Sequence, residues 1–494
     1  MINVNGVEIL LIIGLGIAVS ALAKRRGVQP GLIIVVLAAA VSFIPGLPRL
    51  ELESELILAI VVPPLLYSAA RGAAFTSLGA NLRPIITLGV ALVVLTTAAL
   101  GVITSWLLPT MGLATAFVLG AVLAPPDTIT TVSHGGELGL PKRVTSILTG
   151  ESLLNDATAL TLFTIAVAAV SGDEATWAGG IGRFLYTAVA GLLIGLIFGV
   201  GTLWLRKRLH NATLETALVL LLPFTAFLAA EEIHASGILA VVLASFAVTT
   251  NLTFDPQHQY PGGHLTRLQE DAVWPVLDFL LETFVFAYIG LQLRFVLEDL
   301  EFGLGRTLIA AGVLLVAAVV IRLAAVFVLF GRWSLQWKMM RLKMERDPDF
   351  KLRFEQNVQK RRGQPFEPLP SKEILLVSWT GMRGILTLAA AAAVPADVEG
   401  RDAIQVIALV VTLGTLLIQG TTLRALARRL RIDLAAEQSQ EASMRQMGSS
   451  IMAEVSGFEA QRNALGQAVV DRRLDEATAR ELIADIDRRQ AAAG

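Results

Sequence analysis

The stretch Gly150-Glu151-Ser152-Leu153-Leu154-Asn155-Asp156 places two carboxylates inside an apolar run that covers residues 144–170. A run of this length can cross a bilayer as a helix, because about 20 apolar residues span the hydrocarbon core. A charged side chain at that depth costs at least about 2.5 to 3.5 kcal/mol on insertion scales, so such residues are usually kept for ion or proton handling. The stretch therefore predicts a membrane helix that carries a site for ions or protons.

The rest of the chain has the composition of a membrane protein. Of its 494 residues, 54% are hydrophobic and 16% are charged, and the mean hydropathy is +0.65, which is too apolar for a soluble protein of this size. The absence of cysteine excludes disulfides and thiolate metal sites. The first apolar block, residues 7–23, is followed rather than preceded by its basic residues, so we expect a retained span and not a signal peptide.

Hydropathy predicts thirteen membrane spans, of which two are short. We expect them at residues 7–23, 31–44, 55–70, 84–108, 114–125, 144–170, 184–205, 213–230, 233–249, 273–293, 307–330, 374–394 and 404–423. If the amino terminus is outside, nearly every loop rich in Lys and Arg lies in the cytoplasm, as the positive-inside rule requires. The predicted fold class is an all-α polytopic protein of the inner (cytoplasmic) membrane with a cytoplasmic carboxyl terminus.

An odd number of spans fits two six-helix repeats of opposite orientation, which are typical of transporters. The repeats are expected at about residues 1–170 and 213–424, with a connecting helix at about residues 184–205. Together they form a predicted transmembrane domain at residues 1–430. Beyond it, Ser, Gln, Glu, Arg and Ala dominate, which predicts a cytoplasmic helical tail at residues 431–494.

Spans five and twelve occupy equivalent places in the two repeats, and both contain residues that break helices. Span five runs into Pro125-Pro126-Asp127-Thr128, and span twelve contains Thr380-Gly381-Met382-Arg383-Gly384. Unwound backbone at mid-membrane offers carbonyl oxygens and half-helix ends that bind ions. The matched breaks predict a midplane binding site, with Gly381, Arg383 and Gly384 at a helix crossing.

Ser152 and Asp156 are four residues apart and share one helix face, next to the pair Glu151 and Asn155. A hard monovalent cation such as Na+ needs oxygen donors, so Asp156 and Ser152 are its predicted ligands, with backbone carbonyls near Pro126 if that break approaches. Burial disfavours the charged carboxylate, so protons and cations compete for Asp156. Because Asn155 cannot ionise, the pair offers one exchangeable charge, which suits one cation for one proton. A structural ion pair is the alternative role for Asp156.

Two arginines inside predicted spans, Arg322 and Arg383, need partners because an unpaired buried charge is costly. We expect Glu151 to form a structural ion pair with Arg322, which leaves Asp156 available for ions. Arg383 is expected to neutralise the partial charges of helix ends and the charges of acidic groups at the crossing. A gating role is the alternative.

Other acidic residues in the spans are alternative ion contacts. Asp278 and Glu282 share a face of span ten, although Glu282 can instead neutralise Arg322. Glu231 and Glu232 lie where span eight meets the outer surface and can line a vestibule. Both pairs are candidates for secondary sites.

Two further patterns concern packing and surfaces. Gly191, Gly195 and Gly199 allow a close helix approach, which we expect inside the bundle rather than at a dimer contact. The basic segment 332–372 contains Trp333 and Trp337 among other large side chains. It is expected to be either a solvated extension of span eleven or a segment lying on the anionic inner leaflet.

Residues 150–156 resemble the NhaP-type monovalent cation:proton antiporters, the bacterial relatives of the eukaryotic sodium/proton exchangers. The resemblance covers the predicted membrane domain but not the tail. It includes Pro63-Pro64-Leu65-Leu66, Pro125-Pro126-Asp127, Ala230-Glu231, Ser236-Gly237, Ala240, Gly381-Met382-Arg383-Gly384 and Gln419-Gly420-Thr421-Thr422-Leu423.

The resemblance implies thirteen helices, a homodimer, crossed unwound helices at spans five and twelve, and alternating access by a moving core bundle. By this resemblance Asp156 binds both the cation and the proton, and Ser152 is a further ion ligand. Asn155 marks the electroneutral branch of the family. Glu151 pairs with Arg322, and Asp127 supports the unwound stretch.

Two departures from the family pattern affect the expected ion choice. Many members have Thr where this sequence has Pro126, so a hydroxyl ligand is missing while the backbone carbonyl is kept. Tyr67-Ser68-Ala69-Ala70 also lacks the acidic residue that many relatives place after the span-three prolines.

The predicted function is electroneutral exchange of Na+, and also Li+, for H+ in pH homeostasis. The alternatives are K+/H+ exchange on the same scaffold and a membrane sensor that binds cations without moving them. An enzyme is disfavoured because no metal-protease motif, nucleophile elbow or phosphate loop stands out. We expect no cofactor besides the transported ions and no nucleic-acid partner. Membrane lipid and a second copy of the chain are the expected partners.

Overall fold

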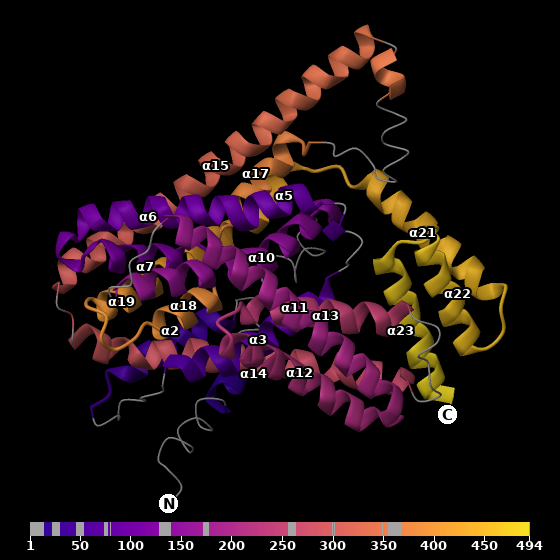
Figure 1. The fold of residues 1–494 in the computed structure, drawn as a ribbon, viewed down its shortest axis with the longest axis horizontal. Coiled ribbons are helices and arrows are strands. Elements are labelled where there is room, and N and C mark those ends of the chain that lie inside the picture. Colours follow the sequence, from indigo (N-terminus) through magenta and orange to yellow (C-terminus); the bar gives the residue numbers. More distant parts are fainter. Residues whose placement is uncertain are drawn as a thin grey trace, which may run out of the picture.

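Helices are the only regular elements among the described residues of the computed structural model (Figure 1). Seven of these helices are long and apolar enough to cross a membrane, and the predicted all-α polytopic class is confirmed. The described residues are 14–21, 30–45, 54–73, 78–79, 81–127, 140–170, 177–254, 263–298, 300, 302–347, 349–353 and 368–493.

Each predicted span from residue 31 onward corresponds to a helix or to a run of joined or broken helices. The helices are α2 (Pro30–Ser42), α3 (Ser54–Gly72), α5 (Leu82–Ile86), η1 (Thr87–Leu92), α6 (Val93–Leu107), α7 (Leu113–Leu123), α10 (Lys142–Val170), α11 (Trp177–Leu209), α12 (Ala212–Glu232), α13 (Gly237–Phe254), α14 (Gly263–Glu298), α15 (Leu304–Arg346), α17 (Ser371–Trp379), α18 (Ile385–Ala392), α19 (Arg401–Thr415), η4 (Leu416–Gly420) and α20 (Thr421–Leu430). A short 3-10 turn, η2 (Pro109–Met111), precedes α7. Of the first predicted span, residues 14–21 are described and are helical, while the rest lies outside the described residues.

The bundle is organised around two large apolar cores. Helices α2, α3, α12, α13 and α14 share one core, which includes Val61, Val241 and Trp274. Helices α6, α7, α15 and α19 share the other, which includes Leu119 and Leu314. Helices α10 and α18 contribute side chains to both cores. They therefore lie where the helices of the first core meet the helices of the second.

The small residues of α11 face α13. A Cβ atom added at Gly195 would lie 2.3 Å from the Ala240 carbonyl oxygen, and one at Gly191 would lie 2.5 Å from that of Ser236. Gly199 approaches Ala244 and Ala247 in the same way. The expected use of these glycines for packing inside the bundle is confirmed.

Two helices are much longer than the apolar blocks that predicted them. Helix α14 has 36 residues and α15 has 43, because hydropathy marks only the part of a helix that is apolar. The continuation of α15 to Arg346 is rich in Lys, Arg, Met and Leu, which are good helix formers. The expected helical extension of span eleven is therefore present, although residues 354–367 of that segment lie outside the described residues.

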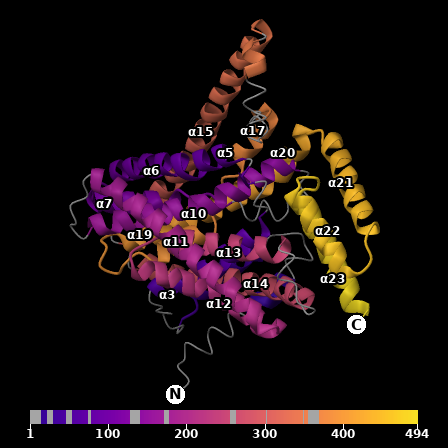
Figure 2. The ribbon, with the colours of Figure 1, turned by 45° about the vertical axis from the view of Figure 1, so that its right-hand side comes forward.

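The last three helices are α21 (Ala435–Ala453), α22 (Phe458–Val470) and α23 (Glu476–Ala493), drawn in yellow in Figures 1 and 2. Their apolar side chains form a small core of their own around Leu465 and Ile486. The division of the chain at residue 430 stays a prediction, but the helical character expected for the tail is present.

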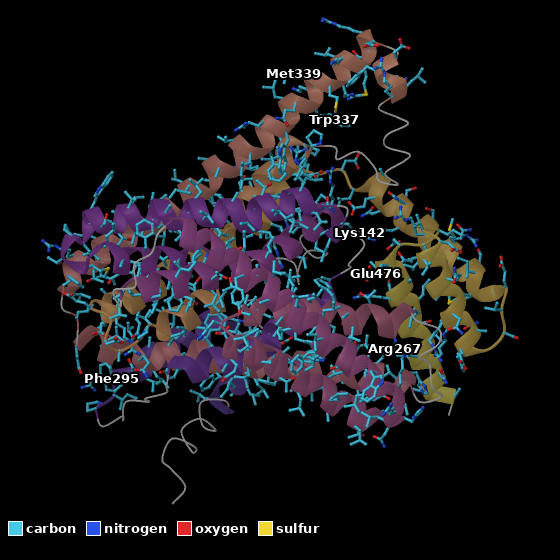
Figure 3. The ribbon with its side chains drawn as sticks, in the orientation of Figure 1. Lys142, Arg267, Phe295, Trp337, Met339 and Glu476 are labelled. Carbon is cyan, nitrogen blue, oxygen red and sulfur yellow. The ribbon has the colours of Figure 1, made fainter. Side chains whose placement is uncertain are left out.

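These tail helices contact both halves of the bundle through ion pairs. Asp487 of α23 accepts hydrogen bonds from Arg267 of α14, at 2.6 Å from Nε and 2.8 Å from Nη2, and from Arg462 of α22 at 3.0 Å. At the start of α10, the Lys142 amide donates to Glu437 at 2.6 Å and its ammonium lies 2.7 Å from Glu441. Figure 3 shows Lys142 and Arg267 at the ends of the membrane helices that face the yellow helices.

Substitution of Asp487 is expected to release the tail from α14. The carboxylate is 2% exposed, and loss of charge-assisted hydrogen bonds costs about 1.5 to 3 kcal/mol, so Asp487→Ala should raise the undocked population about 10-fold or more. Limited trypsin digestion of purified protein measures this as faster cleavage within the tail. Asp485→Ala is the matched control, because Asp485 is half exposed and pairs with Arg488 and Arg489 of its own helix. Equal cleavage of both variants would contradict the docking role of Asp487.

Candidate ion-binding site at the helix crossing

Two broken helices meet in the middle of the bundle. Helix α7 ends at Leu123, and the chain is unwound as far as Asp127 because Pro125 and Pro126 have no amide hydrogen to donate to a helix. The second break separates α17 from α18 at residues 380–384. The Asp127 amide donates to the Met382 carbonyl at 2.6 Å, so the two unwound stretches are joined directly by their backbones.

Glycine at position 384 lets the Asp127 carboxylate lie against the amino end of α18. A Cβ atom added at Gly384 would be 1.8 Å from the Asp127 Oδ2 atom, and one at Gly381 would be 2.3 Å from the Arg322 Cδ atom. The amino end of a helix carries a partial positive charge, which stabilises an adjacent carboxylate. The crossing therefore holds the negative charge of Asp127 without a basic side chain from α18.

Gly384→Ala is expected to slow ion exchange at least about 10-fold, because the new methyl group must displace Asp127 from α18, and small displacements at a binding site have effects of this size or larger. The variant is reconstituted into vesicles, and internal pH is followed after a cation pulse. Gly312→Ala in α15 is the control, since no atom lies within 4 Å of the added methyl group there. Wild-type rates for both variants would show that contact with Gly384 does not hold Asp127 in place.

Helix α10 places four polar residues next to this crossing. Glu151 and Asn155 are fully buried, and Ser152 and Asp156 are 2% and 7% exposed. The Asn155 amide nitrogen donates to the Pro126 carbonyl at 2.9 Å. The charges of Asp156 and Asp127 are close enough to interact. The structure thus brings the α10 residues together with the first break, although Asn155 and Pro126 are 29 residues apart in the sequence.

Arg322 of α15 reaches the same helix from the other side. Its Nη1 and Nη2 atoms donate to the two oxygens of Glu151 at 2.5 and 3.1 Å, and Nη2 also donates to the Val377 carbonyl of α17 at 3.0 Å. Both side chains are almost completely buried. This bidentate pair links α10, α15 and α17, and it neutralises the carboxylate that lies five residues before Asp156.

Arg383 uses its guanidinium to satisfy the carbonyl groups of the two breaks. Its Nε atom donates to the Leu123 carbonyl at 2.6 Å, and Nη1 donates to the Gly381 carbonyl. The Arg383 amide donates to Thr415 Oγ1 at 2.9 Å. Because Leu123 is the last residue of α7, the guanidinium complements the negative end of that helix. Arg383 lies between helix ends, with 2% of its surface exposed.

The other acidic candidates are distributed differently. Ser68 donates to Asp278 at 2.5 Å, and Glu282 is within electrostatic range of both Asp127 and Asp278, so this pair faces the crossing from α14. Glu231 instead accepts from the Gly237 amide at 3.3 Å and caps α13, and Glu232 is exposed. The carboxylate that contacts Arg322 belongs to Glu151 and not to Glu282.

Sequence reasoning missed an ion-pair network between α3, α11, α12 and α14. Arg71 lies 2.5 Å from Asp271 and 3.6 Å from Glu270, while Arg206 lies 2.9 Å from Glu270 and 3.4 Å from Glu215. In the sequence these residues are seen only as charges near the ends of predicted spans. Their partners could not be predicted because they are up to 200 residues apart. A second miss is the π-helical turn η1, which contacts α10 where Gly89 approaches Leu154.

Acidic side chains outnumber basic ones at the crossing, where Asp278 and Glu282 add to the acids of α10 and of the first break. Three carboxylates, from Asp127, Glu151 and Asp156, face the two guanidinium groups of Arg322 and Arg383. Within the described residues, no group of three His, Cys, Asp or Glu side chains could hold a metal ion. When its acids are ionised, the crossing therefore carries a net negative charge, which attracts cations.

A polytopic helical bundle with two broken helices crossing beside a buried acid defines a secondary transporter. The chain belongs to the transmembrane sodium/hydrogen exchanger family, whose model matches residues 5–429. It is a membrane protein of the cation/proton antiporter class.

Individual relatives agree with this family. The chain is 28% identical over 438 residues to the sodium/proton antiporter NhaH of Halobacillus dabanensis. The alignment covers 86% of this chain and 97% of that protein. It is 29% identical over 373 residues to the sodium, potassium, lithium and rubidium/proton antiporter of Bacillus subtilis, over 73% of this chain and 51% of that protein. Its fold is similar to that of the sodium proton antiporter MjNhaP1 from Methanocaldococcus jannaschii, with a TM-score of 0.62 and 15% identity over 86% of this chain and 98% of that one.

Proposed function

We propose that this antiporter exchanges Na+, and also Li+, for H+ in a one-to-one ratio, with Asp156 as the ligand that the cation and the proton share. The observation that carries the proposal is the position of the Asp156 carboxylate, which is buried on α10 beside the crossing and lies within interaction range of Asp127. Glu151 is neutralised by Arg322, Asn155 cannot ionise, and Asp127 lies at the amino end of α18. Asp156 is then the group whose charge a bound ion or proton must neutralise.

The proposed cation ligands are the Asp156 carboxylate, the Ser152 hydroxyl and the Pro126 carbonyl. A carbonyl oxygen has two lone pairs, so the hydrogen bond from Asn155 to Pro126 leaves one for the cation. Asp127 and Asn155 hold the unwound stretch in place. Oxygen donors of this kind suit hard cations. If a cation and a proton were bound to one carboxylate together, the buried site would carry a net positive charge, which is costly. The cation and the proton therefore compete for Asp156.

Alternating access is proposed to move the helices around one apolar core relative to those around the other. Helices α10 and α18 contribute to both cores, which supports a site that can be opened to either side of the membrane. The charge balance of the site is the same with Na+ bound and with H+ bound, so the cycle moves no net charge. This supports electroneutral exchange.

K+/H+ exchange is the second candidate. Its support is the absence of a side-chain hydroxyl at Pro126, which leaves fewer strong ligands for a small cation, and the Bacillus subtilis relative is named for sodium, potassium, lithium and rubidium. Selectivity among these ions depends on cavity size and ligand number.

The test is proton exchange by purified protein in vesicles with an imposed pH gradient, followed with a dye for internal pH. We expect Na+ and Li+ to collapse the gradient and K+ to leave it intact, at a rate that an imposed membrane potential does not change. Collapse by K+ at the Na+ rate would favour the second candidate, and a rate that follows the membrane potential would reject the one-to-one ratio. Failure of every cation would reject transport and favour a sensor.

The topology is part of the proposal. We propose an outside amino terminus, a cytoplasmic tail at residues 431–494, an inner-membrane location and a homodimer. The positive-inside rule assigns the basic last turns of α3, α11 and α20 to the cytoplasm. The tail contacts the first of them, since Arg480 donates to the Arg71 carbonyl at 2.9 Å. Because the chain has no cysteine, a single Val470→Cys substitution in α22 reports the side of the tail. Labelling of intact cells by an impermeant maleimide would reject this orientation.

A further inference from the structure

The end of α15 projects from the bundle. At 1.5 Å per residue, its 43 residues make a helix about 65 Å long, about twice the thickness of the hydrocarbon core. Figures 1 and 2 both show its last part, in orange, leaving the other helices, and Figure 3 shows Trp337 and Met339 on that part. We call residues 332–346 the α15 arm.

The arm begins where membrane interface residues gather. Phe330 is fully buried, and the Trp333 ring packs edge-on against it with ring centroids 5.0 Å apart. The Arg83 guanidinium lies over the Trp333 ring, 5.4 Å from its centroid. Tryptophan and basic residues are enriched where a span meets the headgroups. The residues after Trp333 therefore start at the level of the lipid headgroups.

An exposed apolar stripe runs along the arm. Leu335, Met339 and Leu342 follow each other at spacings of four and three residues, which places them on one helix face. They are 58%, 55% and 53% exposed. Three large apolar side chains in a row on a helix that leaves the bundle indicate a surface that is covered by something other than the described part of this chain.

Basic side chains flank this stripe. The arm carries Arg332, Lys338, Arg341, Lys343 and Arg346 against a single acid, Glu345, whereas the whole chain has a net charge of -1. All five basic residues are exposed. With 100° per residue, Arg332 and Lys343 lie on one side of the stripe and Lys338 on the other. An apolar face bordered by Lys and Arg is the pattern of a helix that lies at an anionic membrane surface.

We propose that the α15 arm binds the anionic phospholipid headgroups of the leaflet from which α15 emerges. Leu335, Met339 and Leu342 insert among the upper acyl chains, and the basic residues contact phosphate groups. The arm continues a membrane span, lies oblique to α6 in Figure 1, and starts at the contact of Trp333 with Arg83, so its first turns are the part nearest to the headgroups. Basic side chains near the membrane surface are attracted by an anionic leaflet, and an apolar stripe beside them can enter the acyl chains. This favours lipid over a soluble acidic protein as the partner.

The absence of cysteine allows a direct test on the full-length protein. Single substitutions Leu335→Cys and Leu342→Cys are labelled with a fluorophore that reports polarity, and the protein is reconstituted into phosphatidylcholine vesicles with or without phosphatidylglycerol. We expect a blue shift, and quenching by nitroxide-labelled lipid, that are several times larger with phosphatidylglycerol. Replacement of the five basic residues by Gln should remove this difference, and Lys338→Gln with Lys343→Gln should reduce it. Val470→Cys, at a 65% exposed site in α22, is the control and should stay in water.

Four results would overturn the proposal. The first is a fluorophore emission wavelength at the arm equal to that at Val470 in both kinds of vesicle, and the second is lipid quenching that is the same with and without phosphatidylglycerol. The third is a blue shift that soluble glycerol phosphate alone produces in detergent. The fourth is formation of a disulfide between two chains that carry Leu335→Cys. The third would indicate a phosphate site rather than a membrane surface, and the fourth would indicate a second copy of the chain as the occupant. Elution and melting of each variant in detergent show that the fold is kept.

Discussion

Asp156→Asn is expected to abolish cation-driven proton movement, with a fall in exchange rate of at least about 100-fold. The amide can neither release a proton nor supply a negative charge. Loss of a charge-assisted ligand costs about 3 kcal/mol, which corresponds to a factor of about 100. The protein should still insert and purify, because Asn is close to Asp in size and the bonds that join the crossing come from Asp127, Asn155 and Arg383.

The measurement is internal pH in vesicles after a Na+ pulse, combined with calorimetry of Na+ binding in buffers of different ionisation enthalpy. Wild-type protein should release a proton when Na+ binds, and Asp156→Asn should neither bind Na+ nor release a proton. Glu232→Gln makes the same chemical change at an exposed acid of α12 and should exchange within about twofold of wild type. Sodium-dependent proton flux that survives in Asp156→Asn would remove Asp156 from the site.

Arg322→Met is expected to cause the largest loss of stability of any single substitution at the crossing. It leaves the Glu151 carboxylate buried and unpaired, and breaking a buried ion pair costs about 3 to 5 kcal/mol. We expect a much lower yield of folded protein and a lower melting temperature in detergent. The double variant Glu151→Gln with Arg322→Met should recover most of the stability, because it removes both charges together.

Arg294→Met is the control for this experiment, since Arg294 forms a partly exposed pair with Glu298 one turn away on α14. Such surface pairs contribute about 0 to 1 kcal/mol. If Arg322→Met melted like wild type and changed only the kinetics of exchange, the pair would belong to the transport cycle rather than to the support of α10. A double variant less stable than Arg322→Met would show that each charge has other partners.

Much of the fold could be predicted from the sequence because a bilayer imposes simple rules. A helix must satisfy its own backbone hydrogen bonds and must be about 20 apolar residues long, so the spans from residue 31 onward could be located from hydropathy. The ends of α14 and α15 could not, because beyond the apolar part nothing but helix propensity and packing decides where a helix stops. A helical extension of span eleven was one of the two expectations for residues 332–372, but its end at Arg346 could not be located.

The candidate site was predictable to a similar degree. Asp156, Ser152 and Arg383 are conspicuous because a polar side chain in an apolar run has a high energetic cost. The contact of Asp127 with α18 and the hydrogen bond from Asn155 to Pro126 were beyond such reasoning. They join segments that are near in space but not in sequence, and periodicity within a helix carries no information about which other helix it meets.

The sequence by itself determined that this chain crosses a membrane many times, that two of its spans are broken, and that residues 150–156 place two acids in an apolar run without a basic residue. These properties follow from the cost of placing charge and unsatisfied backbone in hydrocarbon, which each segment incurs on its own. Only the tertiary structure decided between Glu151 and Glu282 as the partner of Arg322, and only it showed that Arg383 satisfies the end of α7 and that the tail is joined to α14 through Asp487. Those outcomes depend on the relative positions of helices, which are set by packing across the whole bundle.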